Sequence, residues 1–271
     1  MEESSIKRKT YIGVNFINPS EVKALFNELE QTPSKPFEPY LIAYVDFLGM
    51  KDKMKQENSY ASFRILQAIL LGVRKKAAFI EKINAIDDFV IKIFSDNIII
   101  ALKIKEDMLS TQIISILNLV SLLQFEAFFQ FGFPLRGGVT IGELFIDDSV
   151  VWGTGLIEAY QIEDKLANYP RVIVSQKVID TYEDLKEKDI NLFAFIRQDQ
   201  DGYWFIHYLI AAPNIELIPT LSANLAEEAS LCEDKDDRAK QKINWIISYF
   251  NDSCREFRDR GDYEKYVVPY I

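Results

Sequence analysis

Two runs rich in isoleucine and valine, Phe89–Phe94 and Asn97–Lys103, are separated only by the dipeptide Ser95-Asp96. β-Branched residues favour strands, and so short a connection is typical of an antiparallel hairpin. Segments with apolar residues at helical spacing lie on either side of this hairpin, at residues 59–82 and 109–131. A hairpin between two helical crossovers predicts an α+β sheet.

The other segments extend this pattern. A short apolar run from Tyr40 ends in Asp46 and Gly49, which predicts a buried first strand followed by a sharp turn. We expect one helix, or two in series, at residues 59–82. Further strands are expected at residues 135–145 and 171–174, with a helix at residues 155–167 between them. The order βααββαβ, followed by αβ, predicts a ferredoxin-like fold with helices on one face of the sheet.

The ends of the chain differ from this central part. Residues 1–38 are polar, contain an amphipathic segment at residues 21–29 and finish in the proline-rich TPSKPFEP, so we interpret them as an extension and linker. The main domain is expected at residues 39–212, where strands at residues 193–197 and 203–209 extend the sheet through a DQDG turn. Residues 213–271 are expected to form a helical C-terminal extension.

Composition limits the possible partners. The chain has 31 Lys and Arg against 41 Asp and Glu, a formal charge of -10, which disfavours a nucleic-acid polymer as ligand. A single nucleotide remains compatible, because a bound metal ion can supply positive charge locally. Cys232 and Cys254 show neither disulfide nor zinc spacing, and the N-terminus lacks the apolar core of a signal peptide, so we expect a cytoplasmic protein. Polar residues interrupt the apolar stretch 113–133, which argues against a membrane span.

Two aspartates carry the predicted chemistry. Asp46 ends the first strand, and Asp96 lies at the tip of the hairpin. In a βααββαβ sheet these two places are neighbours, so the carboxylates should face one another. Paired carboxylates repel unless a cation lies between them, and hard cations such as Mg²⁺ or Mn²⁺ prefer oxygen ligands. Taken singly, either aspartate could instead be a cap or a turn residue.

Four motifs now point to a family. YVDFLGMK, KIFSDNIII, LRGGVTIGELF and WGTGLIEAYQIEDKLANYPRVIVS occur in the order in which the class III nucleotidyl cyclases carry similar sequences. The likeness covers roughly residues 40 to 180. Within that class, FSDN, RGG, GLIEAYQIE and ANYPR resemble the bacterial pyrimidine cyclases of the Pycsar anti-phage systems, which make cyclic UMP or cyclic CMP.

The resemblance implies a site and an assembly. Asp46, Phe47 and Asp96 would hold two divalent ions, Mn²⁺ or Mg²⁺, and the backbone from Phe47 through Leu48 to Gly49 would contact phosphates. Lys92 would contact the base. A homodimer with shared active sites is implied, as is a separate effector that responds to the cyclic nucleotide.

Other positions leave alternatives open. Tyr44 shares a strand face with Asp46 and points to the site or into the core. Arg136 or Arg171 could replace the transition-state arginine of the purine cyclases, although each could instead face water at a strand end or pair with Glu163. Glycines in the RGG motif would allow a nucleotide or another backbone to approach closely. His207, the sole histidine, is expected in the core.

The departures from the purine enzymes concern base selection. Val150, Ile157 and Gln161 stand where those enzymes carry the adenine-reading aspartate and the transition-state asparagine and arginine. We therefore expect a pyrimidine nucleotide cyclase, with UTP preferred over CTP. A catalytically inactive nucleotide-binding regulator and a purely structural interaction domain are the alternatives.

Overall fold

The computed structural model describes residues 18–31, 37–50, 59–185, 190–211, 215–256 and 264–271. The chain divides into two units, residues 1–36 and 37–271. The sequence-based boundaries at 38/39 and 212/213 remain predictions. Residues 1–17 and 32–36 of the predicted extension and linker, and residues 213–214 and 257–263 of the predicted C-terminal extension, lie outside the described residues.

The first unit contains the helix α1 (Pro19–Gln31). Its start is capped reciprocally: the Asn18 side chain accepts a hydrogen bond from the Glu21 N–H at 2.9 Å, and the Glu21 carboxylate accepts one from the Asn18 N–H at 2.9 Å. Such a capping box uses backbone donors that have no partner within the helix. The predicted amphipathic segment is therefore a helix.

The second unit is built on a mixed sheet with the strand order β2-β3-β1-β4-β6-β8-β7, and β5 pairs with β4 off this path. Its strands are β1 (Glu38–Phe47), β2 (Val90–Phe94), β3 (Asn97–Lys103), β4 (Leu135–Ile146), β5 (Val151–Trp152), β6 (Val172–Val174), β7 (Ile196–Gln198) and β8 (Trp204–Ile206).

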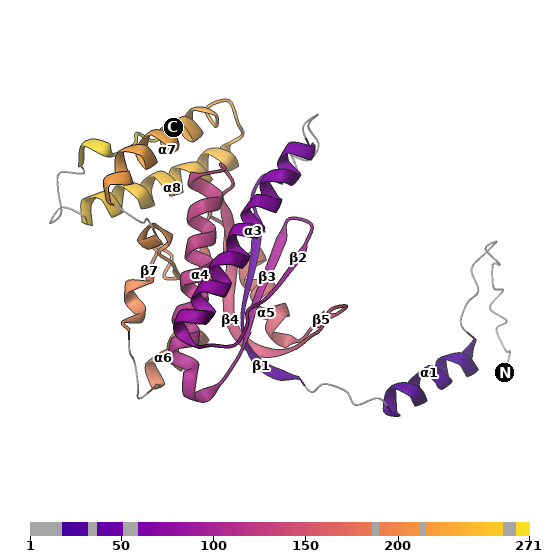
Figure 1. Cartoon of the computed structure of the whole chain (residues 1–271). Coiled ribbons are helices and arrows are strands. Elements are labelled where there is room, and N and C mark those ends of the chain that lie inside the picture. Colours follow the sequence, from indigo (N-terminus) through magenta and orange to yellow (C-terminus); the bar gives the residue numbers. More distant parts are fainter. Residues whose placement is uncertain (1–17, 32–36, 51–58, 186–189, 212–214, 257–263) are drawn as a thin grey trace, which may run out of the picture. The chain divides into compact units, whose positions relative to one another are not determined.

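The first four main strands have ferredoxin-like topology. β1 pairs antiparallel with both β3 and β4, and β2 pairs antiparallel with β3, so β1 runs parallel to β2 and β3 runs parallel to β4. The crossover helices α3 (Ser59–Asn84) and α4 (Leu109–Phe129) lie side by side on one face of the sheet (Figure 1). The predicted α+β class is confirmed, and α3 is one continuous helix.

Helices cover both faces of the sheet, which corrects the expectation of a single covered face. Leu41 and Ala43 of β1 belong to the core beneath α3 and α4, whereas Ile42 packs with Ala159 of α5 (Thr154–Lys165) on the opposite face. The approach of α5 is very close: a Cβ atom at Gly138 would lie 2.6 Å from the Ala159 carbonyl oxygen. The glycine motif was expected to let a nucleotide or another backbone approach closely. In this structure the backbone of α5 makes such an approach at Gly138.

The C-terminal part departs most from the predicted element boundaries. The tail that was expected to be helical contains two helices, α7 (Ile218–Ser230) and α8 (Asp237–Glu256), and α6 (Gln176–Asp184) follows β6. The strands β7 and β8 are shorter than expected because the apolar residues around them form 3₁₀ turns instead. These two turns are Leu192–Ala194 and Tyr208–Ala211. Further 3₁₀ turns among the described residues lie at Glu106–Met108, Ile215–Leu217 and Glu264–Tyr266.

A second apolar cluster joins this C-terminal part to the sheet. Phe125 and Phe129 of α4 pack with Phe205 of β8 and with Phe250 of α8. His207 lies in this cluster, where its Nδ1 is 2.6 Å from the Tyr249 hydroxyl, so the prediction of a core histidine is confirmed. Neither Cys232 nor Cys254 forms a disulfide bond.

One helical stretch among the described residues, Glu106–Phe129, is long and apolar enough to cross a membrane by length and composition alone. However, 67% of its most apolar window is buried inside the fold. Its apolar side chains pack on β1, β3 and β4, which accounts for its hydrophobicity as that of a core helix.

Candidate active site

The end of β1 lies beside the tip of the β2–β3 hairpin, as the sequence predicted. Asp46 is the register partner of Asn97, and the Phe47 N–H donates a hydrogen bond of 3.1 Å to the Asp96 carbonyl oxygen. Ser95 adopts a positive φ of 56°, which allows the tight two-residue turn. Asp96 is only 4% exposed. Both aspartates therefore lie at the same end of the sheet.

The site occupies the sheet face that α5 covers. Lys92, Ile99, Tyr44 and Gly138 are register partners in one row across β2, β3, β1 and β4. Side chains alternate along a strand, so Asp46 projects from the same face as Tyr44. The predicted site residues of three separate segments thus share one surface.

Acidic groups converge on the Tyr44 phenol. Burial, followed by the nearby carboxylates of Glu163 and Asp46, the Tyr160 hydroxyl and then Asp96, raises the pKa of Tyr44 to about 12. Its ring packs edge to face against Tyr160 of α5, with 5.6 Å between the ring centroids. Tyr44 is consequently a neutral hydroxyl at physiological pH, and it lies at the site rather than wholly in the core.

Arg136 bridges two carboxylates at this end of the sheet. Its Nε is 3.3 Å from Asp46 Oδ2, and its terminal guanidinium nitrogen is 2.6 Å from Glu163 Oε1. The Glu163 side chain is 4% exposed, and Arg136 supplies it with a charged partner. The pairing with Glu163 that the sequence allowed is present, and the same arginine also reaches Asp46.

The turn after β1 differs from its sequence-based interpretation. We expected exposed backbone N–H groups from Phe47 to Gly49, but the Phe47 N–H bonds to Asp96 and the Leu48 N–H donates to the Pro134 carbonyl oxygen at 2.9 Å. These bonds fix the turn against the hairpin and β4, so these two donors are already used. Gly49 has a positive φ of 79°, the left-handed conformation that glycine tolerates best.

Lys92 has only a weak partner. Its ammonium is 3.6 Å from Asp148 Oδ1, and the Asp148 side chain is fully exposed. An exposed ion pair contributes little, so the Lys92 ammonium can exchange this partner for another acceptor at small cost.

The carboxylates suit a divalent cation that arrives with its substrate. Among the described residues, no group of three or more His, Cys, Asp and Glu side chains is placed to hold a metal ion. Mg²⁺ is commonly bound by one or two carboxylates together with substrate phosphates, without a complete protein cage. The adjacent Asp46 and Asp96 fit that kind of site, with Phe47 beside them as the third predicted ligand.

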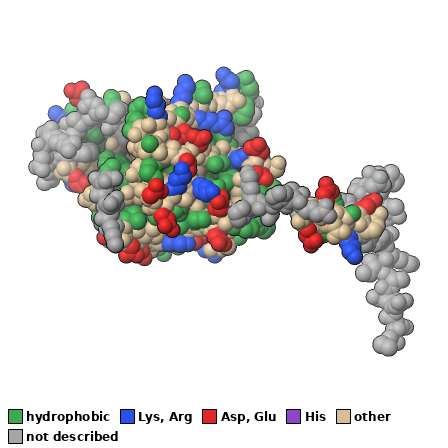
Figure 2. Space-filling model, turned by 60° about the horizontal axis from the view of Figure 1, so that its bottom comes forward, with side chains coloured by type: hydrophobic (Ala, Val, Ile, Leu, Met, Phe, Trp, Pro, Cys, Tyr) green, Lys and Arg blue, Asp and Glu red, His purple; other side chains and the backbone are tan. Residues whose placement is uncertain are grey.

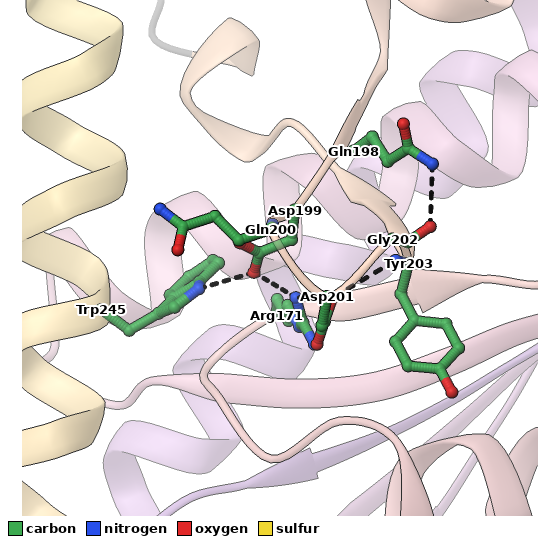
Figure 3. A network of polar contacts seen from close by, with 8 residues as sticks. All are labelled: Arg171, Gln198, Asp199, Gln200, Asp201, Gly202, Tyr203 and Trp245. Atoms are coloured by element: carbon green, nitrogen blue, oxygen red, sulfur yellow. Dashed lines mark hydrogen bonds and ion pairs between the residues drawn. The ribbon is translucent and has the colours of Figure 1, made fainter.

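Arg171 is committed to another role. Its side chain is completely buried and forms ion pairs with Asp199 and Asp201. The guanidinium contacts both carboxylate oxygens of Asp201, and the distance from Arg171 Nη1 to Asp201 Oδ1 is 3.1 Å. Asp199 also accepts a hydrogen bond of 2.8 Å from the Trp245 indole N–H (Figure 3). Arg171 therefore fastens the β7–β8 turn to the start of β6, and Arg136 is the arginine that lies at the site.

An apolar surface flanks the site on β5 and α5. We call the exposed side chains of Val150, Trp152, Ile157 and Tyr160 the arm patch; they are 45%, 67%, 53% and 46% exposed. Gln161, which stands where the purine cyclases carry the transition-state arginine, is exposed as well. Clustered apolar residues on a surface are typical of an interaction site.

Sequence reasoning named Glu163 only as a possible partner of an arginine and did not name Tyr160, and it placed neither residue beside Tyr44. The spacing of apolar residues predicted the α5 helix, but nothing in the spacing showed that this helix covers the face that carries Asp46.

No protein-family model and no curated protein sequence matches this chain. Solved structures with a similar arrangement include the crystal structure of the guanylyl cyclase Cya2, with a TM-score of 0.40 and 12% identity over 65% of this chain and 94% of that one. Two structures of a bacterial light-regulated adenylyl cyclase have TM-scores of 0.38 and 0.37 and identities of 11% and 12%. They cover 72% and 70% of this chain, and 100% and 64% of their own. At these values, a function for this chain has to come from its own residues.

Proposed function

We propose that this chain is a metal-dependent nucleotide cyclase that converts UTP to 3′,5′-cyclic UMP and pyrophosphate. The observation that carries the proposal is the adjacency of Asp46 and Asp96 at one end of the sheet, with Arg136 beside them. Two carboxylates and a guanidinium together match a metal-bound triphosphate in charge and in ligand type.

The reaction is an in-line displacement. The ribose 3′-oxygen attacks the α-phosphorus, the new P–O bond closes the ring, and the bond to pyrophosphate breaks. Divalent ions at Asp46 and Asp96, with Phe47 as the further ligand, would lower the pKa of the 3′-hydroxyl and neutralise the leaving pyrophosphate. Arg136 offers a planar fork to a phosphate, and Tyr44 remains a hydrogen-bond donor because its pKa is raised.

Base selection is proposed to depend on Val150 and Lys92. Val150 has no hydrogen-bonding side chain, so it cannot accept a hydrogen bond from the exocyclic amine of adenine. The Lys92 ammonium is only a donor and suits carbonyl oxygens, of which uracil has two and cytosine one. UTP is therefore the first candidate and CTP the second.

The substrate is a single nucleotide rather than a nucleic-acid polymer. The formal charge is -10, and acidic and basic side chains are interspersed on the face shown in Figure 2. A polymer would need a continuous basic surface to neutralise many phosphates. At this site, bound cations can supply that charge for one triphosphate.

The proposed assembly is a homodimer that shares its active sites. The arm patch supports this assembly. Val150 and Ile157 are exposed on the single chain, whereas the resemblance places the corresponding residues of the purine cyclases against the substrate. A second subunit docked on this patch would cover them and bring Val150 to the partner's nucleotide. The same resemblance makes the cyclic nucleotide an anti-phage signal read by a separate effector in the cytoplasm.

A second candidate is a nucleotide-binding regulator without turnover. It is favoured by Ile157 and Gln161, whose side chains cannot replace a transition-state asparagine and arginine. This regulator would bind nucleotides and metal without releasing product.

The test is product formation by the purified protein with UTP and Mn²⁺, compared with the variants Asp46→Ala and Asp96→Ala. Each variant should lose at least about a hundredfold in rate, because each removes a metal ligand. Asp107→Ala is the control, since Asp107 is an exposed carboxylate that follows the far end of β3. Circular dichroism checks the fold. Wild-type rates in either site variant would contradict the proposal.

A further inference from the structure

Besides the apolar cluster, a polar and aromatic contact through Trp245 anchors the C-terminal helix α8 beside the sheet. The Trp245 indole N–H donates to Asp199, which is ion-paired with Arg171 at the start of β6 (Figure 3). The Trp245 ring is also nearly parallel to the Tyr169 ring, at 9° and with 6.1 Å between centroids. These contacts fix both the position of α8 and the face that it turns to the sheet.

That anchor is close to Arg136 through the backbone. The Gly137 N–H donates a hydrogen bond of 3.2 Å to the Arg171 carbonyl oxygen, and Gly137 is the register partner of Val172. The start of β6, on which Trp245 is anchored, is therefore joined to the start of β4, where Arg136 meets Asp46. The face of α8 that carries Trp245 looks toward this end of the sheet.

Lys242 lies on that face. It precedes Trp245 by three residues and follows Arg238 by four, spacings that place side chains on the same side of a helix. Its side chain is partly buried, and no ion-pair partner for it occurs among the described residues. Lys242 thus lies on the side of α8 that is anchored near the starts of β6 and β4, although it is almost 200 residues away from Asp46 along the chain.

The electrostatic surroundings of Lys242 agree with this placement. Burial, and then the Arg136 guanidinium, lower the pKa of Lys242, while the Asp236 and Asp46 carboxylates act in the opposite direction. Arg238 adds a further, smaller lowering. A cation that is penalised by burial and by neighbouring cations gains most from an anion placed between them.

We infer that Lys242 binds the β- and γ-phosphates of the substrate and the pyrophosphate that leaves. The inference rests on the proposed function and extends it, because it makes the C-terminal helix part of the active site. Arg136 is shared between Asp46 and Glu163, whereas Lys242 forms no direct ion pair with a carboxylate among the described residues. The phosphate tail is the group with enough negative charge to be its partner.

Binding of inorganic tripolyphosphate with Mn²⁺, measured by calorimetry, tests the inference without a base, a ribose or turnover. Lys242→Met keeps most of the apolar stem and removes the charge; it should weaken binding about tenfold or more, as expected for a lost charge-assisted contact. Lys242→Arg should restore part of that loss. Lys240→Met is the matched control, because a residue two positions away projects about 200° around the helix.

The outcomes separate this inference from the proposed function. The inference is overturned if Lys242→Met binds tripolyphosphate as tightly as wild type, if Lys240→Met loses as much, or if the wild type does not bind. A wild type that makes no cyclic nucleotide but binds tripolyphosphate through Lys242 would refute the cyclase and support the phosphate site. In an active enzyme, Lys242→Met should also raise the KM for UTP about tenfold or more.

Discussion

Arg136 and Asp46 stand opposite each other in the β1–β4 register, and their contact of 3.3 Å is long for a charge-assisted hydrogen bond. The shorter contact of Arg136, 2.6 Å, is with the buried Glu163. Glu163 therefore holds the guanidinium in place, and Asp46 keeps coordination capacity for a cation. Removing Glu163 would be expected to displace Arg136 rather than to remove a metal ligand.

His207 gives a prediction about stability. Burial, helped by the nearby Arg197, lowers the pKa of His207 to about 3, and this is the only histidine in the chain. In the unfolded chain the imidazole takes up a proton below about pH 6.5, whereas in the fold it stays neutral. Acidification from pH 7 to pH 5 should therefore cost about 2 kcal/mol of unfolding free energy through this residue.

Urea denaturation of wild type and His207→Gln at pH 7 and pH 5 measures this effect. Glutamine keeps a polar group near the Tyr249 hydroxyl and does not titrate in this range. The loss of stability between the two pH values should be smaller in the variant by about 2 kcal/mol. An equal loss in both proteins would show that His207 is not buried in its neutral form.

The residues of the site differ in how far the sequence could predict them. The adjacency of Asp46 and Asp96 could be predicted, because each is next to a strong strand signal and the topology brings those two points together. The role proposed for Lys242 could not be predicted, because Lys242 lies in a helix with no catalytic motif and its placement depends on the packing of α8. The backbone N–H groups of Phe47 and Leu48 were expected to be exposed, but both donate hydrogen bonds to carbonyl oxygens of other segments. The local sequence could not show this, because the acceptors lie far away along the chain.

At the scale of elements, β1 determines most of the arrangement. Leu41, Ile42 and Ala43 are all fully buried, so both sides of this strand need a helix, and a continuous apolar run already indicates this. The strands β7 and β8 were harder to bound, since the apolar residues around them pack equally well as 3₁₀ turns. Apolar character predicted that these residues are buried, but not their backbone conformation.

The arm patch leads to a prediction about assembly. Trp152→Glu places a charge on the most exposed of its large apolar side chains, so it should convert the proposed dimer to a monomer and abolish cyclase activity. Phe79→Glu is the control, because Phe79 is 63% exposed on α3, a helix on the opposite face of the sheet. Light scattering after size exclusion gives the mass of each variant. A monomeric wild type, or an active monomeric variant, would contradict the shared-site assembly.

Mixed dimers test whether each site draws on both chains. One chain carries Asp46→Ala and the other carries a change at Lys92, the proposed base-contacting residue, and each is expected to be inactive alone. Arg136 is left intact in both chains, because it contacts Asp46 within the same chain. Co-assembly should then restore part of the activity, because one of the two shared sites can recover a complete set of residues. If heterodimers are confirmed by mass and remain inactive, the assignment of these residues to opposite subunits is wrong.

At the scale of the whole molecule, residues 37–271 form one unit in which the C-terminal helices complete the sheet's surroundings. The aromatic cluster of α4, β8 and α8 connects them to the same core element that crosses from β3 to β4. A regulatory event that moved α8 would shift Trp245 and Lys242 together. The chain's acidic surface leaves the local cations as the means of attracting a nucleotide.

The most direct test of the central claim is the kcat/KM of the purified wild type for UTP, CTP, ATP and GTP with Mn²⁺ under one set of conditions. We expect cyclic UMP as the favoured product and cyclic CMP as the next. We expect ATP to be used about tenfold to a hundredfold less well, because Val150 leaves the adenine amine unpaired at a cost of about 1–3 kcal/mol. No cyclic product from any of the four nucleotides, with Asp46 and Asp96 intact, would contradict the cyclase itself, and a preference for ATP or GTP would contradict the pyrimidine assignment.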